Sequence, residues 1–260
     1  MKRFFTDFKN YFHYAVYSAK ASLQAEVAGS YLNWLWWVFN PLCLMVIYSI
    51  VFGTIFDAKE KYFSVFIFIG LTLWDYFNRT ITSSIKVVKA NKAIVTKVFL
   101  PKFILSVQLI FINFVKMLFS IGIIIIMMIF YRVPITWNVL WIFPLLVVYT
   151  IFIFACSTIM LHYGVFIEDL NNIVRIILRF VYYLTGIFFS VEKRIPVPYN
   201  YYVVRLNPLS YFITSARKVL IYQKPLYWKW LIAWLVVSVL LAIFGVYKIY
   251  KYENSYAKVI

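Results

Sequence analysis

The residue types that perform most enzyme chemistry are scarce in this chain. Its 260 residues include two histidines, two cysteines and nine acidic residues. His13 and His162 have none of the paired spacing of a metal site, and the acidic residues are scattered. Cys43 and Cys156 both lie in apolar segments, without redox or metal-ligand spacing. We therefore predict that the chain is not an enzyme and binds no cofactor or metal.

Signatures of nucleotide and nucleic-acid binding are also absent. There are seven glycines and no glycine-rich phosphate loop, so any ATP hydrolysis has to be supplied by another subunit. No basic-aromatic nucleic-acid module occurs, and a net charge of +17 indicates membrane topology and anionic lipid instead. The first long apolar run begins near residue 34 without a small-residue cleavage pattern, so no removable signal peptide is expected.

Apolar residues dominate what is present. Hydrophobic residues make up 64% of the chain and charged residues 13%, and the mean hydropathy is +0.84. A soluble domain carries about twice that share of charge. We predict an all-α integral membrane protein in which residues 34–260 form a six-helix transmembrane domain. The predicted spans are Trp34–Phe56, Tyr62–Phe77, Phe103–Tyr131, Asn138–Gly164, Asn172–Ser190 and Trp230–Tyr247.

The first predicted span has the clearest membrane signature. Its 23 residues contain no charge, and a helix rising about 1.5 Å per residue crosses a hydrocarbon layer of roughly 30 Å over such a length. Trp34, Trp36 and Trp37 gather at its start, where aromatic rings favour the headgroup boundary. Pro41 removes one backbone hydrogen bond and predicts a local bend.

Two segments flank the spans without crossing the membrane. Residues 1–33 carry apolar side chains at helical spacing from Phe4 to Ala15, which predicts an amphipathic interfacial helix; the alternative is a frayed basic tail. Residues 191–228 are interrupted by prolines and hold two apolar stretches, 195–204 and 209–222, that are too short to cross. Short helices dipping into the membrane, or a re-entrant hairpin, fit this segment best.

Six spans place both termini on one side of the membrane. That side carries 13 basic residues and the other side 10, of which seven belong to the long segment 191–229. Short loops and span ends weigh most in the positive-inside rule. Without the long segment the counts are 13 and 3. We therefore predict a multi-pass protein of the cytoplasmic (inner) membrane with both termini cytoplasmic, although the seven outer charges oppose that assignment.

Three basic residues fall inside predicted spans, where charge is costly and faces protein or water. Lys116 either lines a pathway or pairs with a polar group on a neighbouring helix. Arg175 and Arg179 are four residues apart, so they share one helix face. They form either a polar entry for an anionic headgroup or ordinary interfacial anchors paired with Glu168 or Asp169.

Aromatic residues make up 22% of the chain. Sugar rings present apolar C–H faces that stack on aromatic rings, so an aromatic-lined conduit would let a glycan slide. Membrane belts and packing are the alternative for any single ring. Together with the three basic residues, our candidate substrate path includes Trp36, Tyr182, Tyr183 and Phe188.

The polar section Arg79–Lys102 is longer than a topology anchor requires. Apolar residues such as Ile94 and Phe99 are interspersed with its lysines. We favour a cytoplasmic segment that docks on a partner, with a lipid-binding anchor as the alternative. The residues assigned to partner coupling are Lys86, Lys89, Lys92, Lys97, Lys102, Glu168 and Asp169.

Three stretches resemble the ABC transporter permeases that export O-antigen, teichoic acid and capsule polysaccharides. They are YLNWLWWVFNP (31–41) continued by VIYSIVFG (46–53), GVFIED (164–169) leading to ILRFVYY (177–183), and LNPLSYF (206–212). The chain departs from the usual pattern at Glu26, where a basic residue is common, at Asn33, where glycine is usual, and at Thr185-Gly186, where Ser-Pro often occurs.

The resemblance implies a homodimer that works with two copies of a separate ATP-binding subunit, which binds ATP and Mg²⁺. It further implies a lipid-linked glycan substrate, O-antigen in the first instance, and external gate helices within residues 191–228. Under it the surface helix and the Arg79–Lys102 segment contact the ATP-binding subunit. Alternatives are a teichoic-acid or capsule exporter, an exporter of small lipids or drugs, and a passive channel or scaffold without any ATPase.

Overall fold

The computed structural model describes residues 2–28, 32–55 and 60–259, and within these it contains helices and no strands. Residues 29–31 and Phe56, which belong to predicted segments, lie outside the described ranges. The elements are α1 (Lys2–Val27), η1 (Asn33–Leu35), α2 (Trp36–Tyr48), η2 (Ser49–Ile55), α3 (Phe63–Ala90), α4 (Lys92–Lys97), α5 (Phe103–Phe130), η3 (Trp137–Trp141), α6 (Ile142–Phe166), α7 (Leu170–Leu184), α8 (Val191–Arg194), α9 (Tyr199–Leu206), α10 (Pro208–Leu220), α11 (Trp228–Lys251) and α12 (Glu253–Val259).

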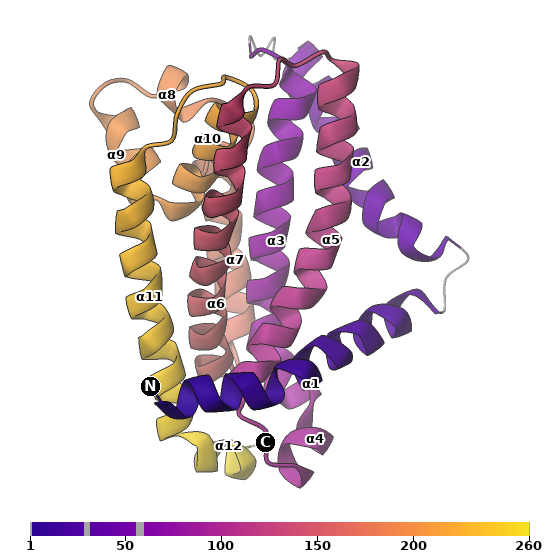
Figure 1. The fold of residues 1–260 in the computed structure, drawn as a ribbon, viewed down its shortest axis with the longest axis vertical. Coiled ribbons are helices and arrows are strands. Elements are labelled where there is room, and N and C mark those ends of the chain that lie inside the picture. The colour runs from indigo at the N-terminus through magenta and orange to yellow at the C-terminus, as the bar shows by residue number, and fades with distance from the viewer. Residues whose placement is uncertain (1, 29–31, 56–59, 260) are drawn as a thin grey trace.

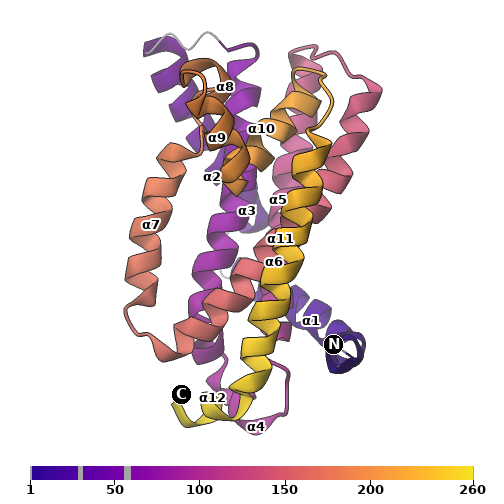
Figure 2. The ribbon, with the colours of Figure 1, turned by 90° about the vertical axis from the view of Figure 1, so that its left-hand side faces the viewer.

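Long helices run along one axis of the molecule, with short helices at both ends (Figure 1). Both termini lie at the same end, close to α1, α4 and α12, whereas α8, α9 and the end of α10 lie at the opposite end (Figure 2). We call these the terminal end and the distal end. The predicted all-α fold class is therefore confirmed for the described residues.

Four helical segments in the described part of the chain are long and apolar enough to cross a membrane, whereas the sequence predicted six spans. They are Trp36–Gly53, Phe103–Phe130, Trp137–Phe166 and Trp228–Lys251. The second predicted span does not end at Phe77, because α3 continues without a break to Ala90 and the polar residues of its second half lower its hydropathy. The fifth is α7, whose 15 residues give about 22 Å at about 1.5 Å each.

Helix α7, which corresponds to the fifth predicted span, ends six residues before Ser190, the predicted end of that span. Its end coincides with Thr185 and Gly186, and Gly186 adopts a φ of +76°, a conformation that favours glycine over other residues. The Thr185-Gly186 pair therefore stops the helix, and the following residues turn back into the protein, where Ile187 and Phe188 are buried.

The predicted N-terminal helix forms over Lys2–Val27, and its apolar face packs against protein. Ala15 and Ala19 are buried. Phe4 and Phe12 lie against α5, with ring centroids 4.9 Å from Phe103 and 5.5 Å from Phe111, respectively. Helix α1 thus crosses the terminal end of the bundle, with its apolar stripe on α5 (Figure 1).

Helix α6 packs closely against α3 because Gly164 has no side chain. A Cβ placed at Gly164 would collide with the backbone carbonyl of Ile85 on α3. Near this contact the hydroxyls of Ser84 and Ser157 share a hydrogen bond of 2.7 Å between the same two helices. Small residues and interhelical hydrogen bonds of this kind are how membrane helices associate without a hydrophobic driving force.

The segment 191–228 forms three helices where two were expected, and α10 is mostly buried. Asn207 caps α10 by accepting hydrogen bonds from two backbone amides, and Pro208 stands at its first turn. Arg217 of α10 is 3% exposed. Its guanidinium donates to the carbonyls of Phe66, Gly186 and Ile187 at 3.0, 2.7 and 2.7 Å. Arg217 therefore fastens α10 to α3 and to the turn after α7.

Candidate functional site

A cavity of about 750 Å³ lies between α3 and α7, with α2 at its edge. Four of the seven residues predicted for the substrate path line it, two cationic and two aromatic. The lining residues are Leu44, Leu71, Trp74, Asp75, Asn78, Thr82, Arg175, Leu178, Arg179, Tyr182 and Tyr183.

Helical spacing explains why these side chains meet. On α3 the lining residues between Leu71 and Thr82 recur every three or four positions, and on α7 the same spacing holds between Arg175 and Tyr183. Residues three and four apart share a helix face. The two faces are opposed, so the polar stripe of α3 faces the basic and aromatic stripe of α7.

The cavity carries more positive than negative charge. Arg175 and Arg179 are both exposed. Among the residues that the structure describes, no ion pair joins either of them to Glu168 or Asp169, the pairing considered from sequence. The one carboxylate in the lining belongs to Asp75, which bonds Arg79 at 3.2 Å. Both arginines of α7 therefore remain available to an anionic ligand.

Asp75 is the site residue that sequence reasoning missed. The sequence did contain a signal for it, because Asp75 lies in an apolar segment with Arg79 four residues later. Two such charged residues share a helix face and have to face protein or water. The predicted span was taken to end close to it, at Phe77. Since α3 continues past that point, Asp75 instead lies within the helix and beside the cavity.

Aromatic rings continue from the cavity toward the distal end. The ring of Tyr182 lies 5.1 Å from Trp74 and 5.2 Å from Phe188, between centroids. Phe188 in turn stacks on Phe52 at 4.5 Å and meets Tyr48 at 4.9 Å. The resulting wall begins near Arg179, and aromatic faces of this kind offer stacking surfaces without strong polar sites.

Lys116 and Trp36 lie apart from this cavity. The Lys116 ammonium contacts the Glu26 carboxylate at 2.6 Å and lies 5.6 Å from the ring of Trp37. Lys116 thus has a carboxylate partner on a neighbouring helix, as one of the two alternatives considered from the sequence expected. Trp36 is exposed on α2 and is not among the lining residues.

The residues assigned to partner coupling gather at the terminal end. Helix α4 and the connection between α6 and α7 both lie there (Figure 2). The first four lysines of the set are exposed, as are Glu168 and Asp169. Lys102 differs, because it is 6% exposed and burial lowers the pKa of its ammonium, an effect partly offset by the charge of Glu253. Lys102 is thus part of the packing beneath this surface.

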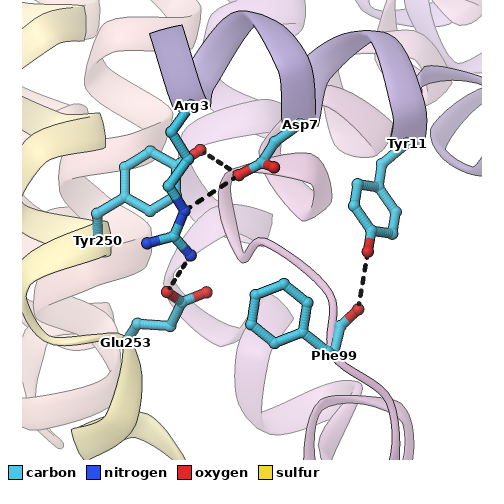
Figure 3. Close-up of polar contacts among 6 residues, drawn as sticks. All are labelled: Arg3, Asp7, Tyr11, Phe99, Tyr250 and Glu253. Carbon is cyan, nitrogen blue, oxygen red and sulfur yellow. Dashed lines mark hydrogen bonds and ion pairs between the residues drawn. The ribbon is translucent and has the colours of Figure 1, made fainter. Parts of the chain in front are cut away.

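Polar contacts bind the first helix to the last at the same end (Figure 3). Arg3 donates to Glu253 at 2.7 Å, and the Tyr250 hydroxyl donates to Asp7, also at 2.7 Å. The Tyr11 hydroxyl donates to the carbonyl of Phe99, beside α4, at 3.4 Å. These contacts connect α1 with α11, α12 and the chain that follows α4.

Comparison with known families agrees with this geometry. Residues 17–221 match the family model described as "ABC-2 type transporter". The family resemblance stated from the sequence is therefore confirmed.

Named relatives of similar length give the same result. The chain is 26% identical over 196 residues to a protein of Klebsiella pneumoniae named "O-antigen export system permease protein RfbA", with 75% of each chain covered. A Myxococcus xanthus protein of the same name is 24% identical over 198 residues, with 76% of each chain covered.

Proposed function

Because the chain belongs to the ABC-2 type transporter family, we propose that it is the membrane subunit of an ATP-driven exporter of a lipid-linked polysaccharide. The substrate that we assign is a glycan of the O-antigen type, as in the names of the two relatives. The observation that carries the proposal is the cavity between α3 and α7, in which two arginines lie beside a wall of aromatic rings.

In this proposal the chain crosses the inner membrane six times, through α2 with η2, α3, α5, α6, α7 and α11. Besides the four long apolar segments, the 28 residues of α3 give about 42 Å at about 1.5 Å each, enough to span. Helix α7 and residues 185–190 together supply the fifth crossing. Both termini lie at one end, as an even number of crossings requires (Figure 2).

We assign the terminal end to the cytoplasm. Lys86, Lys89, Lys92 and Lys97 project there from α3 and α4, next to membrane-crossing helices, which is where the positive-inside rule weighs charge most. The distal end, with α8, α9 and α10, then faces outward and carries the external gate helices.

The basic and the aromatic residues of α7 have separate roles in the proposed transport. Arg175 and Arg179 bind the anionic linkage of the lipid-linked glycan, since a guanidinium forms paired hydrogen bonds with phosphate oxygens. Tyr182 and Tyr183 present rings on which the sugars slide, and the buried ring of Phe188 packs behind them. The cavity is completed at a homodimer interface made by α2 and α7, whose apolar side chains, among them Ile47 and Ile176, are exposed.

The energy for transport comes from ATP hydrolysis in two copies of a separate ATP-binding subunit, which binds the ATP and Mg²⁺. Its docking surface on this chain consists of α4, its flanking lysines and the Glu168-Asp169 connection. Exposed apolar residues here, Ile94 and Val98, would be buried by the partner. The contacts of α1 with α11 and with the chain after α4 would carry the partner's closure into the bundle.

The test is ATP-dependent export in vesicles that contain this chain and its ATP-binding subunit. We expect Arg175→Gln with Arg179→Gln to lower export at least about tenfold, because each lost charge-assisted hydrogen bond is worth about 1.5–3 kcal/mol. Arg132→Gln, at an exposed arginine in the turn after α5 and outside the cavity, is the matched control and should leave export unchanged. Full export by the double variant would refute the assigned path.

A separate measurement tests the coupling surface. Replacement of Lys86, Lys89, Lys92 and Lys97 by glutamine should reduce co-purification of the ATP-binding subunit. Unaltered ATP-driven export by that variant, with full partner binding, would refute the docking assignment.

A further inference from the structure

A second cavity, of about 440 Å³, lies at the distal end, away from the proposed path. It is bordered by α8, α9, α10 and the chain that leads into α11. Its lining is polar and aromatic, and consists of Glu192, Asn200, Tyr201, Val204, Arg205, Lys218, Lys224, Pro225 and Tyr227.

Three cations and one carboxylate line this cavity. Lys218 is buried, with 9% of its side chain exposed, and its ammonium bonds Glu192 at 3.0 Å. Among residues 2–28, 32–55 and 60–259, no ion pair involves Arg205 or Lys224. Two positive charges of the lining, on the half-buried Arg205 and the exposed Lys224, therefore have no carboxylate partner among these residues.

Arg205 is held in place but incompletely hydrogen-bonded. Its guanidinium carbon lies 3.0 Å from the ring centroid of Tyr201 and 5.1 Å from that of Tyr227. The buried Nε–H of Arg205 has no hydrogen-bond partner. A buried donor without a partner is costly and rare in native proteins. The aromatic rings thus fix the guanidinium beside the cavity, with one of its donors unpartnered.

We propose that this cavity binds a phosphate or diphosphate ester group. An excess of two positive charges matches the charge of such a group, and the planar guanidinium offers paired donors to its oxygens. Arg205 and Lys224 bind the anion directly. Lys218 adds a third positive charge, which the carboxylate of Glu192 partly neutralises. Tyr201 borders the part of the cavity in which a sugar or glycerol attached to the phosphate would lie.

Two sources share this chemistry. One is the phosphate that joins an exported glycan to its carrier lipid, and the other is the headgroup of a membrane phospholipid. The first source rests on the proposed function, whereas phosphate binding itself depends neither on transport nor on the ATP-binding subunit.

The experiment measures binding of inorganic diphosphate to the purified full chain in neutral detergent by titration calorimetry. We expect Arg205→Gln and Lys224→Gln each to weaken binding at least about tenfold, since each removes a charge-assisted hydrogen bond. Lys229→Gln removes the same charge from an exposed neighbour that does not line the cavity, and should bind as the unaltered chain does.

A gain-of-affinity variant separates ligand binding from misfolding. In Glu192→Gln the amide oxygen still accepts from Lys218 and Tyr227, yet one negative charge is gone, so we expect about fivefold tighter binding at low salt. Absence of diphosphate binding overturns the proposal. So does equal weakening in Arg205→Gln and Lys229→Gln, or an unchanged affinity in Glu192→Gln.

Two further probes identify the source once binding is established. A short-chain polyprenyl diphosphate that binds at least about tenfold tighter than inorganic diphosphate indicates the carrier lipid. Displacement of diphosphate by phosphatidylglycerol in nanodiscs, but not by phosphatidylcholine, indicates an anionic phospholipid headgroup. These binding measurements use neither ATP nor the ATP-binding subunit. A negative result in the vesicle export assay would therefore not change their interpretation.

Discussion

The Lys116 ammonium on α5 lies 2.6 Å from the Glu26 carboxylate near the end of α1. The lysine side chain is 13% exposed and the glutamate side chain 48% exposed. The pair joins the middle of a long apolar helix to the helix that crosses the terminal end. The Glu26 carboxylate also compensates the Lys116 charge, which would be energetically costly inside a membrane-crossing helix without a partner.

We predict that Glu26→Gln destabilises the chain by about 1–3 kcal/mol, because it leaves the Lys116 charge in apolar surroundings without its partner. Lys116→Met should cost less, since it removes the charge along with the pair. Thermal unfolding of both single variants and the double variant gives the coupling between the two residues. Purely additive effects would contradict a direct pair.

Gly164→Ala should destabilise the bundle by about 3 kcal/mol or more, because the added methyl meets the backbone of Ile85 and forces α6 away from α3. Gly122→Ala on α5 is the matched control. Nothing lies within 4 Å of a Cβ at Gly122, and alanine is favoured over glycine in helices by about 1 kcal/mol, so this change should be neutral or stabilising. Similar melting temperatures for the two variants would refute the close approach.

Replacement of Arg217 by leucine should lower the free energy of unfolding by about 3–5 kcal/mol. Three backbone carbonyls would lose their donor in a buried site. Arg194→Leu, on the exposed surface of α8, should have little effect. Denaturation of the purified variants measures the difference, and equal stabilities would show that α10 is held by its apolar contacts alone.

Lys102 gives a pH dependence whose sign can be derived. Its folded-state pKa is lowered by burial, so the unfolded chain binds the proton more readily. The contribution of Lys102 to stability therefore rises with pH, between the lowered folded value and the ordinary value near 10.5. Lys102→Met should stabilise the chain at pH 7, with a smaller gain at pH 10. A gain that grows with pH would contradict the lowered pKa.

The sequence predicted those parts of the fold that depend on local pattern. Uninterrupted apolar runs identified α5, α6 and α11 closely, and four-residue spacing placed Arg175 and Arg179 on one face. The early end of α7 was missed, although Gly186 was visible, because a glycine in an apolar run does not reveal its φ. The burial of Arg217 could not be predicted, since its three carbonyl partners come from other segments.

The same limit applies to the candidate site. Arg175, Arg179, Tyr182 and Tyr183 were found because one helix carries all four. Asp75 was missed because its role depends on the packing of α3 against α7, and the length of α3 was underestimated. Lys116 was assigned with two open alternatives, and its partner Glu26 could not be predicted because it comes from a helix far away in the sequence.

The contact between Arg3 and Glu253 has a practical consequence for anyone who expresses this chain. Residues near both ends of the sequence, Arg3 and Glu253, belong to one small cluster of polar contacts. An affinity tag or fluorescent fusion joined directly to either end would therefore crowd these contacts. A tag inserted with a flexible spacer, or moved into the exposed turn at Arg132, should give cleaner preparations than a short terminal fusion.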